Sequence, residues 1–218
     1  LFSVGRYYAD FRQTSDEEVM DLLQRAAHEE PATAGAVGDD PPLRDEEVEI
    51  PAGAVRLNGQ LTVPDGAAGV IVFAHGSGSS RHSPRNRYVA GVLQRAGLAT
   101  LLFDLLTPQE ELRRANVFDI ELLAGRLGEV TRWLRRQPDC ARHAVGYFGA
   151  STGAAAALWA AAAPGADISA VVSRGGRPDL AGPRLGDLRA PTLLIVGGHG
   201  TVVLELNRRA QALMRCES

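Results

Sequence analysis

The sequence has 218 residues, of which 45% are hydrophobic, and this is enough to build one folded domain with a full core. A formal net charge of −3 at pH 7 provides no basic surface for a polyanion, so we expect no nucleic-acid partner. No stretch approaches the ~20 apolar residues that a membrane-spanning helix needs, which argues against a membrane protein.

The front of the chain differs in composition from the rest. Residues 15–28 combine a capping pattern, Ser15 followed by Glu18, with the apolar stripe of an amphipathic helix. Residues 29–44 are rich in proline, glycine, alanine and acid, which predicts a linker. We therefore predict that residues 1–28 are the tail of a preceding domain and that residues 45–218 form the main domain.

From residue 45 onward, apolar strands alternate with helical patterns. Residues 47–51 and 54–64 predict an antiparallel pair that opens the domain. Further strands are predicted at 70–76, 99–106, 144–150, 170–175 and 191–198, and helices at 84–96, 115–137, 152–163 and 202–215. Continuous apolar strands separated by helices indicate a sheet that is covered on both faces. The predicted fold class is α/β, with a doubly wound, mostly parallel sheet.

One turn carries the pattern of a nucleophilic serine. Residues 149–153 read GASTG, directly after a predicted strand and before a predicted helix. Glycines at both ends allow a sharp turn on which the Ser151 hydroxyl stands clear of the sheet. The alternative is a glycine-rich strand–helix turn with an idle serine.

A second glycine-rich segment, HGSGSSRH at residues 75–82, follows the first predicted parallel strand. Because ligands of open α/β sheets lie at the carboxyl ends of the strands, this loop and the Ser151 turn belong to one edge. Backbone N–H groups of Thr152 and of Gly76 or Ser77 are the candidate donors of an oxyanion hole.

These motifs resemble the α/β-hydrolase superfamily, and most closely its dienelactone-hydrolase-like branch with serine in place of cysteine as nucleophile. VIVFAHGSGSSRHSPRN, LLFDLLT, GYFGASTGAAAAL, VVSRGGRPDLA and PTLLIVGG match its pattern in chain order over residues 45–215. Residues 1–27 resemble instead the tail of a type I phosphoribosyltransferase domain, which implies a fused phosphoribosyltransferase as a partner.

The resemblance leaves two members of the catalytic triad unassigned. In this fold the acid and then the histidine follow the serine along the chain. Gly200 stands where the family's pattern has an aspartate, and Asp179 is the alternative acid, which we interpret first as a capping or loop residue. No histidine follows the last predicted strand, so we expect a fold truncated before its last strand and helix, with the base outside this chain.

The histidines and arginines near the predicted site have simpler interpretations beside functional ones. His75, His82 and Arg81 are candidates for substrate contact, although His75 more readily braces its loop and the arginines are typical of a solvated face. His199 fits a solvent-facing loop better than a base, and Asp104 fits a loop-organising acceptor. Cys140 and Cys216 lack the spacing of a metal site, and no cofactor motif is present.

The sequence thus leads to two hypotheses about function. In the first, the protein is a cytoplasmic serine hydrolase of a small-molecule ester, lactone or thioester, weak or inactive as this chain because triad members are missing. In the second, it is a non-catalytic, hydrolase-like binding or assembly module fused to a phosphoribosyltransferase, which the glycine at position 200 favours.

Overall fold

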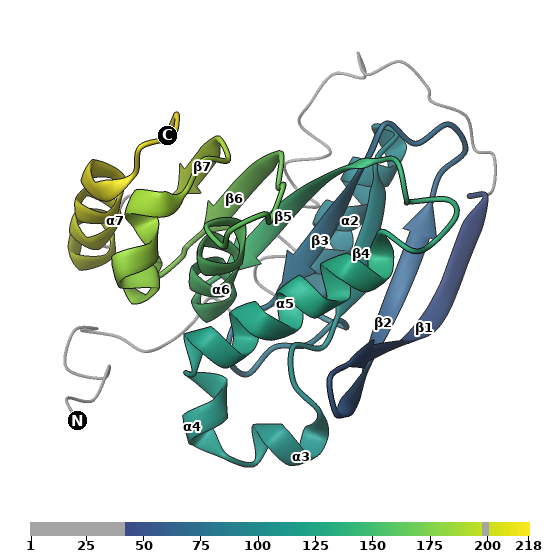
Figure 1. Ribbon diagram of the computed structural model, residues 1–218, viewed down its shortest axis with the longest axis horizontal. Coiled ribbons are helices and arrows are strands. Elements are labelled where there is room, and N and C mark those ends of the chain that lie inside the picture. Colours follow the sequence, from purple (N-terminus) through teal and green to yellow (C-terminus); the bar gives the residue numbers. More distant parts are fainter. Residues whose placement is uncertain (1–41, 198–200) are drawn as a thin grey trace.

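A computed structural model describes residues 42–197 and 201–218, and its centre is a seven-stranded sheet with the order β1-β2-β4-β3-β5-β6-β7 (Figure 1). The strands are β1 (Arg44–Ala52), β2 (Val55–Val63), β3 (Gly69–Ala74), β4 (Ala99–Phe103), β5 (Ala144–Ala150), β6 (Ala170–Arg174) and β7 (Thr192–Ile195). The five strands from β3 to β7 run parallel, while β2 pairs antiparallel with both β1 and β4. The predicted α/β fold with a mostly parallel sheet is confirmed.

The helices cover the two faces of this sheet unequally. They are α2 (Pro84–Arg95), α3 (Pro108–Glu111), α4 (Arg114–Val117), α5 (Ile120–Leu134), α6 (Thr152–Ala161), the 3-10 helix η2 (Pro178–Asp187) and α7 (Thr201–Leu213). Figure 1 shows α5 and α6 side by side on one face, with α2 on the other. The predicted helix at 115–137 is interrupted, because Asp119 caps a new helix at the Leu122 N–H and so separates α4 from α5.

The two faces of the sheet build two separate apolar cores. Along β3, Val70, Val72 and Ala74 join the large core beneath α5 and α6. Ile71 and Phe73 point the other way and pack with Ala90 of α2 and with Leu102 and Phe148. This alternation is the period of two that strands impose, and it explains why β3 reads as an unbroken apolar run.

The sheet begins with the hairpin predicted from the sequence. β1 and β2 pair from Arg44 with Val63 to Ala52 with Val55. The predicted linker at 29–44 is therefore one residue too long, because Arg44 already belongs to β1. The predicted linker up to residue 41 and the predicted helix at 15–28 lie outside the described residues.

β7 forms the other edge of the sheet, and its side chains are poorly covered. Leu193 is 57% exposed and Ile195 is 44% exposed. Both lie in register with β6 residues of the α2 face, Val172 and Arg174. No helix in the described part of the chain is long and apolar enough to cross a membrane.

Candidate active site

The turn predicted to present a nucleophile has the backbone that this role requires. Ser151 follows the last residue of β5 and has a φ of 51° and a ψ of −121°, a conformation that residues with a side chain rarely adopt. It is the N-cap residue of α6, yet its side chain makes no capping hydrogen bond. The serine is thus held on a strained turn without its hydroxyl being used to cap the helix.

Two glycines make this turn sterically possible. A side chain at Gly153 would place its Cβ 2.1 Å from the Ala74 carbonyl oxygen of β3. A side chain at Gly149 would place its Cβ 2.5 Å from the Cα of Ala154 in the first turn of α6. The glycines of the GASTG motif therefore allow β3, β5 and α6 to meet around Ser151, as their spacing predicts.

The loop after β3 lies directly against Ser151. A Cβ at Gly76 would be 2.9 Å from the Ser151 Cβ, so these two predicted site residues are in contact. The Ser77 N–H, however, donates to the Thr152 hydroxyl at 3.0 Å and so already has a partner. Thr152 itself opens α6, where backbone N–H groups lack partners within the helix and suit a developing negative charge.

His75 braces this loop, as one of its two interpretations predicted. It is buried, its Nε2 accepts from the Leu105 N–H at 3.0 Å, and its Nδ1 lies 2.9 Å from the Gly76 carbonyl oxygen. The accepting Nε2 requires the proton to be on Nδ1, which then donates to Gly76. Both ring nitrogens of His75 are therefore engaged: Nε2 joins the end of β3 to the segment that follows β4, and Nδ1 binds within its own loop.

Arg81 anchors the other end of the same loop. Its backbone N–H donates to Asp104 Oδ1 at 2.8 Å, and its Nη1 contacts Asp104 Oδ2 at 2.6 Å. Asp104 is thus the loop-organising acceptor expected from the sequence, and Arg81 forms an ion pair with it. His82 is exposed and contacts Arg87 Nη2 through Nδ1 at 2.9 Å, which leaves its predicted role at the site without a supporting contact.

The described residues provide no base for Ser151. His75 and His82 are engaged as above, and His143 precedes β5, at the opposite end of that strand from Ser151. Within residues 42–197 and 201–218, no histidine forms a hydrogen bond with Ser151. His28, Gly198, His199 and Gly200 lie outside the described residues.

The alternative acid, Asp179, forms a bidentate ion pair with Arg177. Its two carboxylate oxygens accept from Arg177 Nε at 2.8 Å and Nη2 at 2.7 Å. It lies in the first turn of η2 but does not cap it, so the capping interpretation was wrong while the loop interpretation agrees with the structure. An acid that already binds an arginine in this bidentate way is poorly placed to orient a histidine.

Residues 174–177, the end of β6 and the loop after it, form backbone hydrogen bonds with Ser151 that the sequence analysis did not predict. The Ser151 N–H donates to the Arg174 carbonyl oxygen at 3.4 Å, and the Arg177 N–H donates to the Ser151 carbonyl oxygen at 3.3 Å. A Cβ at Gly176 would lie 2.7 Å from the Ala154 Cβ, so this loop packs closely on α6. These are backbone contacts, for which the sequence offers only the glycine pair 175–176 as a signal.

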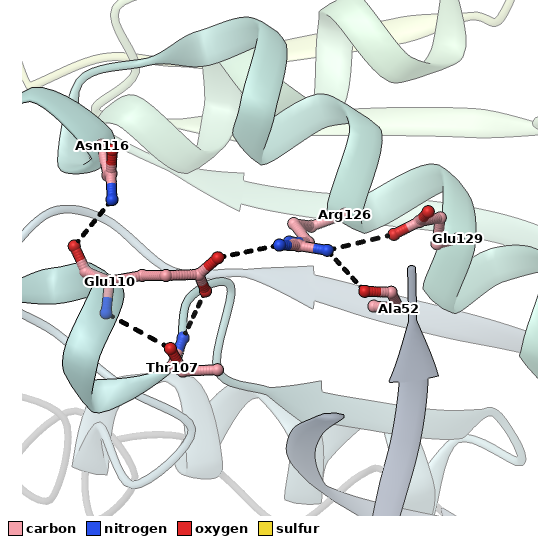
Figure 2. Close-up of polar contacts among 6 residues, drawn as sticks. All are labelled: Ala52, Thr107, Glu110, Asn116, Arg126 and Glu129. Carbon is pink, nitrogen blue, oxygen red and sulfur yellow. Dashed lines mark hydrogen bonds and ion pairs between the residues drawn. The ribbon is translucent and has the colours of Figure 1, made fainter. Parts of the chain in front are cut away.

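A separate polar network fixes the connection between β4 and α5. Figure 2 shows Glu110 between Thr107 and Arg126, with Arg126 also reaching the Ala52 carbonyl oxygen at the β1–β2 turn. Burial alone would raise the pKa of Glu110, but the Thr107 N–H and the Arg126 guanidinium outweigh it and lower the pKa below its ordinary value of 4.5. This carboxylate is therefore structural.

Among the described residues, the ionisable group with the largest pKa shift, Tyr147, lies in the core. Burial raises the pKa of Tyr147 to about 12, although the hydrogen bond with Thr131 acts in the opposite direction. Tyr147 faces the core beneath α5, away from the Ser151 turn. The described residues also contain no cluster of three metal-ligating side chains.

Comparison with known proteins places this geometry in a family. No family model matches the chain. A crystal structure of dienelactone hydrolase from Anabaena variabilis is 55% identical, with a TM-score of 0.78 over 81% of this chain and 83% of that one. The chain belongs to the dienelactone hydrolase family. The resemblance predicted from the motifs is thereby confirmed.

More distant structures show that this dienelactone hydrolase family member has the α/β-hydrolase fold. An esterase from Pyrococcus furiosus is 18% identical, with a TM-score of 0.61 over 84% of this chain and 85% of that one. A dienelactone hydrolase-like promiscuous phosphotriesterase from metagenomic libraries is 21% identical, with a TM-score of 0.55 over 80% of each chain.

The curated relatives of this family member carry a different name. Two proteins from strains of Mycobacterium tuberculosis, each named "Putative phosphoribosyl transferase", are 66% identical over 216 residues, or 98% of this chain. The chain spans 48% of their length. A name of this kind agrees with the predicted fusion of a hydrolase to a phosphoribosyltransferase.

Proposed function

We propose that the protein is a serine hydrolase that cleaves an ester, lactone or thioester of a small molecule through an acyl-enzyme. The observation that carries this proposal is the positive φ of Ser151, directly after β5. Strained backbone of this kind is typical of functional sites, and here it presents the serine side chain. Membership of the dienelactone hydrolase family supports a hydrolytic reaction.

In the proposed reaction, the Ser151 Oγ attacks the substrate carbonyl carbon and loses its proton to a base. The negative charge that forms on the carbonyl oxygen is stabilised by the Thr152 N–H, and by the Gly76–Ser77 backbone once substrate displaces the Thr152 hydroxyl from Ser77. The base then protonates the leaving group, and water cleaves the acyl-enzyme. No cofactor enters these steps.

The proposed base is a histidine outside the described residues. The relatives are about twice as long as this chain, and we infer that the whole protein contains both that histidine and a fused phosphoribosyltransferase domain. We further infer a cytoplasmic location. Losing one triad member lowers the rate by about 10⁴-fold or more, so we expect residues 1–218 alone to be weak or inactive.

The test uses the full-length protein and a fluorophosphonate probe, which reacts with activated serines. We expect the wild-type protein to be labelled and the Ser151→Ala variant to remain unlabelled. Ser77→Ala is a matched control, because it removes a neighbouring hydroxyl and leaves the backbone donor in place. Equal labelling of wild type and Ser151→Ala would eliminate Ser151 as the nucleophile.

A second candidate function is a binding or assembly module without catalysis. It is favoured by Gly200, which replaces the expected acid, and by Asp179, whose carboxylate is held by Arg177. In that case the full-length protein would bind acyl compounds without turnover. Measurable hydrolysis that disappears in Ser151→Ala would rule this candidate out.

A further inference from the structure

Asn207 of α7 makes a contact with the loop behind the nucleophile. The residue is 3% exposed, and its Nδ2 donates to the Gly176 carbonyl oxygen at 3.2 Å and to the Val203 carbonyl oxygen at 2.8 Å. The first acceptor lies 31 positions away in sequence, in the connection between β6 and η2. A buried amide that donates one N–H to a distant backbone carbonyl usually fixes the segment it binds.

That segment is the one that holds Ser151. Residues 174 and 177, on either side of Gly176, form hydrogen bonds with the N–H and the carbonyl oxygen of Ser151. The Gly175 N–H attaches this loop to β7, because it donates to the Ile195 carbonyl oxygen at 2.8 Å. Asn207 attaches the loop to α7, one residue further along.

We propose that Asn207 is a positioning residue for the nucleophile, acting through the Gly176 carbonyl and the 174–177 loop on the backbone of Ser151. This inference rests on the proposed serine hydrolase function. A strained φ persists only when its surroundings hold it, and the loop provides two of the hydrogen bonds that do so. Hydrogen bonds from surrounding residues keep a reactive group within about half an ångström of the position that the reaction requires.

The chemistry at position 207 is specific to an amide. Both neighbours of the Nδ2 group are carbonyl oxygens, so two N–H donors are needed and the orientation of the amide is fixed. Asparagine provides these donors without charge. Aspartate has the same shape but would place oxygen acceptors against the two carbonyl oxygens. Leucine has the same number of side-chain heavy atoms and the same branching, but no donors.

The experiment compares full-length wild type with Asn207→Asp and Asn207→Leu. It measures the rate of fluorophosphonate labelling per folded molecule, kcat and KM for p-nitrophenyl acetate, and Tm. We expect labelling and kcat to fall about tenfold or more in both variants while KM changes little, because misplacing a reactive group slows the chemical step. If Asn207→Asp does not fold, Asn207→Leu, which buries no charge, gives the answer.

Ala210→Gly is the matched control on the same helix. It weakens α7 and opens a small gap in the core without touching Gly176, so we expect a lower Tm and an unchanged labelling rate. Asn207 variants that lower Tm but are labelled at the wild-type rate would overturn the proposal. A wild-type protein that is not labelled would instead overturn the serine hydrolase function.

Discussion

Three glycines determine how closely the chain can approach itself around Ser151. Gly76, Gly149 and Gly153 each occupy a position where a Cβ would lie within 3 Å of a neighbouring atom. At Gly153 the obstacles are two backbone oxygens, those of Ala74 and His75, which cannot rotate away. The reactive turn therefore depends on missing side chains as much as on the serine.

The first prediction concerns Gly153→Ala. The added methyl would require β3 or the start of α6 to move, and we expect a loss of about 1–3 kcal/mol in the free energy of unfolding together with slower labelling of Ser151. Chemical denaturation and fluorophosphonate labelling check the two effects.

Gly125→Ala is the comparison for that variant. Gly125 lies in the middle of α5 with nothing within 4 Å of its missing Cβ. There we expect a gain of about 0.8–1.0 kcal/mol, because alanine favours helix over glycine. A Gly153→Ala variant as stable and as reactive as wild type would show that the close approach at the turn can relax.

At the scale of elements, the sequence analysis was accurate for a long apolar strand and failed for a helix of four residues. The β5 strand, 144–150, was predicted with its correct bounds because it is a continuous apolar run that ends at a glycine-rich turn. Helix α3 was missed although its signal was present, since Thr107 and Glu110 form a capping box with Pro108 at its first position. Asn207 had no such signal, because its partner Gly176 is distant in sequence and contributes only a backbone carbonyl.

The second prediction concerns the α3 network and pH. The pKa of Glu110 is lowered on folding, so its ion pair with Arg126 stabilises the protein fully above pH 4.5, and the effect is lost as pH falls through the lowered value. We expect Glu110→Gln to cost about 1 kcal/mol at neutral pH and progressively less below pH 4.5. Urea denaturation of both proteins across this range checks the difference.

Glu205→Gln supplies the control. Glu205 pairs with Arg209 on the surface of α7, where both side chains are more than half exposed. An exposed pair of this kind contributes about 0–1 kcal/mol to stability. If both glutamate variants behave alike at every pH, the Glu110 network does not differ from a surface ion pair.

At the scale of the whole molecule, the sheet has one well-covered half and one exposed edge. β4, β3 and β5 are buried between helices, whereas Leu193 and Ile195 on β7 face outward. A short edge strand with two exposed apolar side chains can pair with another copy of the same edge.

The third prediction follows from that edge. In the 218-residue chain, we expect Ile195→Lys to reduce self-association measured by light scattering, because a charge on an edge strand opposes pairing between sheets. Leu112→Lys is the control, since Leu112 is 87% exposed but lies in the α3–α4 connection, away from any strand. Unchanged scattering in Ile195→Lys would mean that β7 does not drive association.

The strand order also describes how the domain would assemble during synthesis. β4 must insert between β2 and β3, so the first half of the sheet closes only when residues 99–103 have emerged from the ribosome. From then on β5, β6 and β7 are added outward in chain order, and each covers the edge left by the one before. Besides the edge formed by β1, a nascent chain therefore carries a second edge that moves outward with translation. The Ser151 turn gains its hydrogen bonds with residues 174 and 177 only after β6 and the loop that follows it have been added.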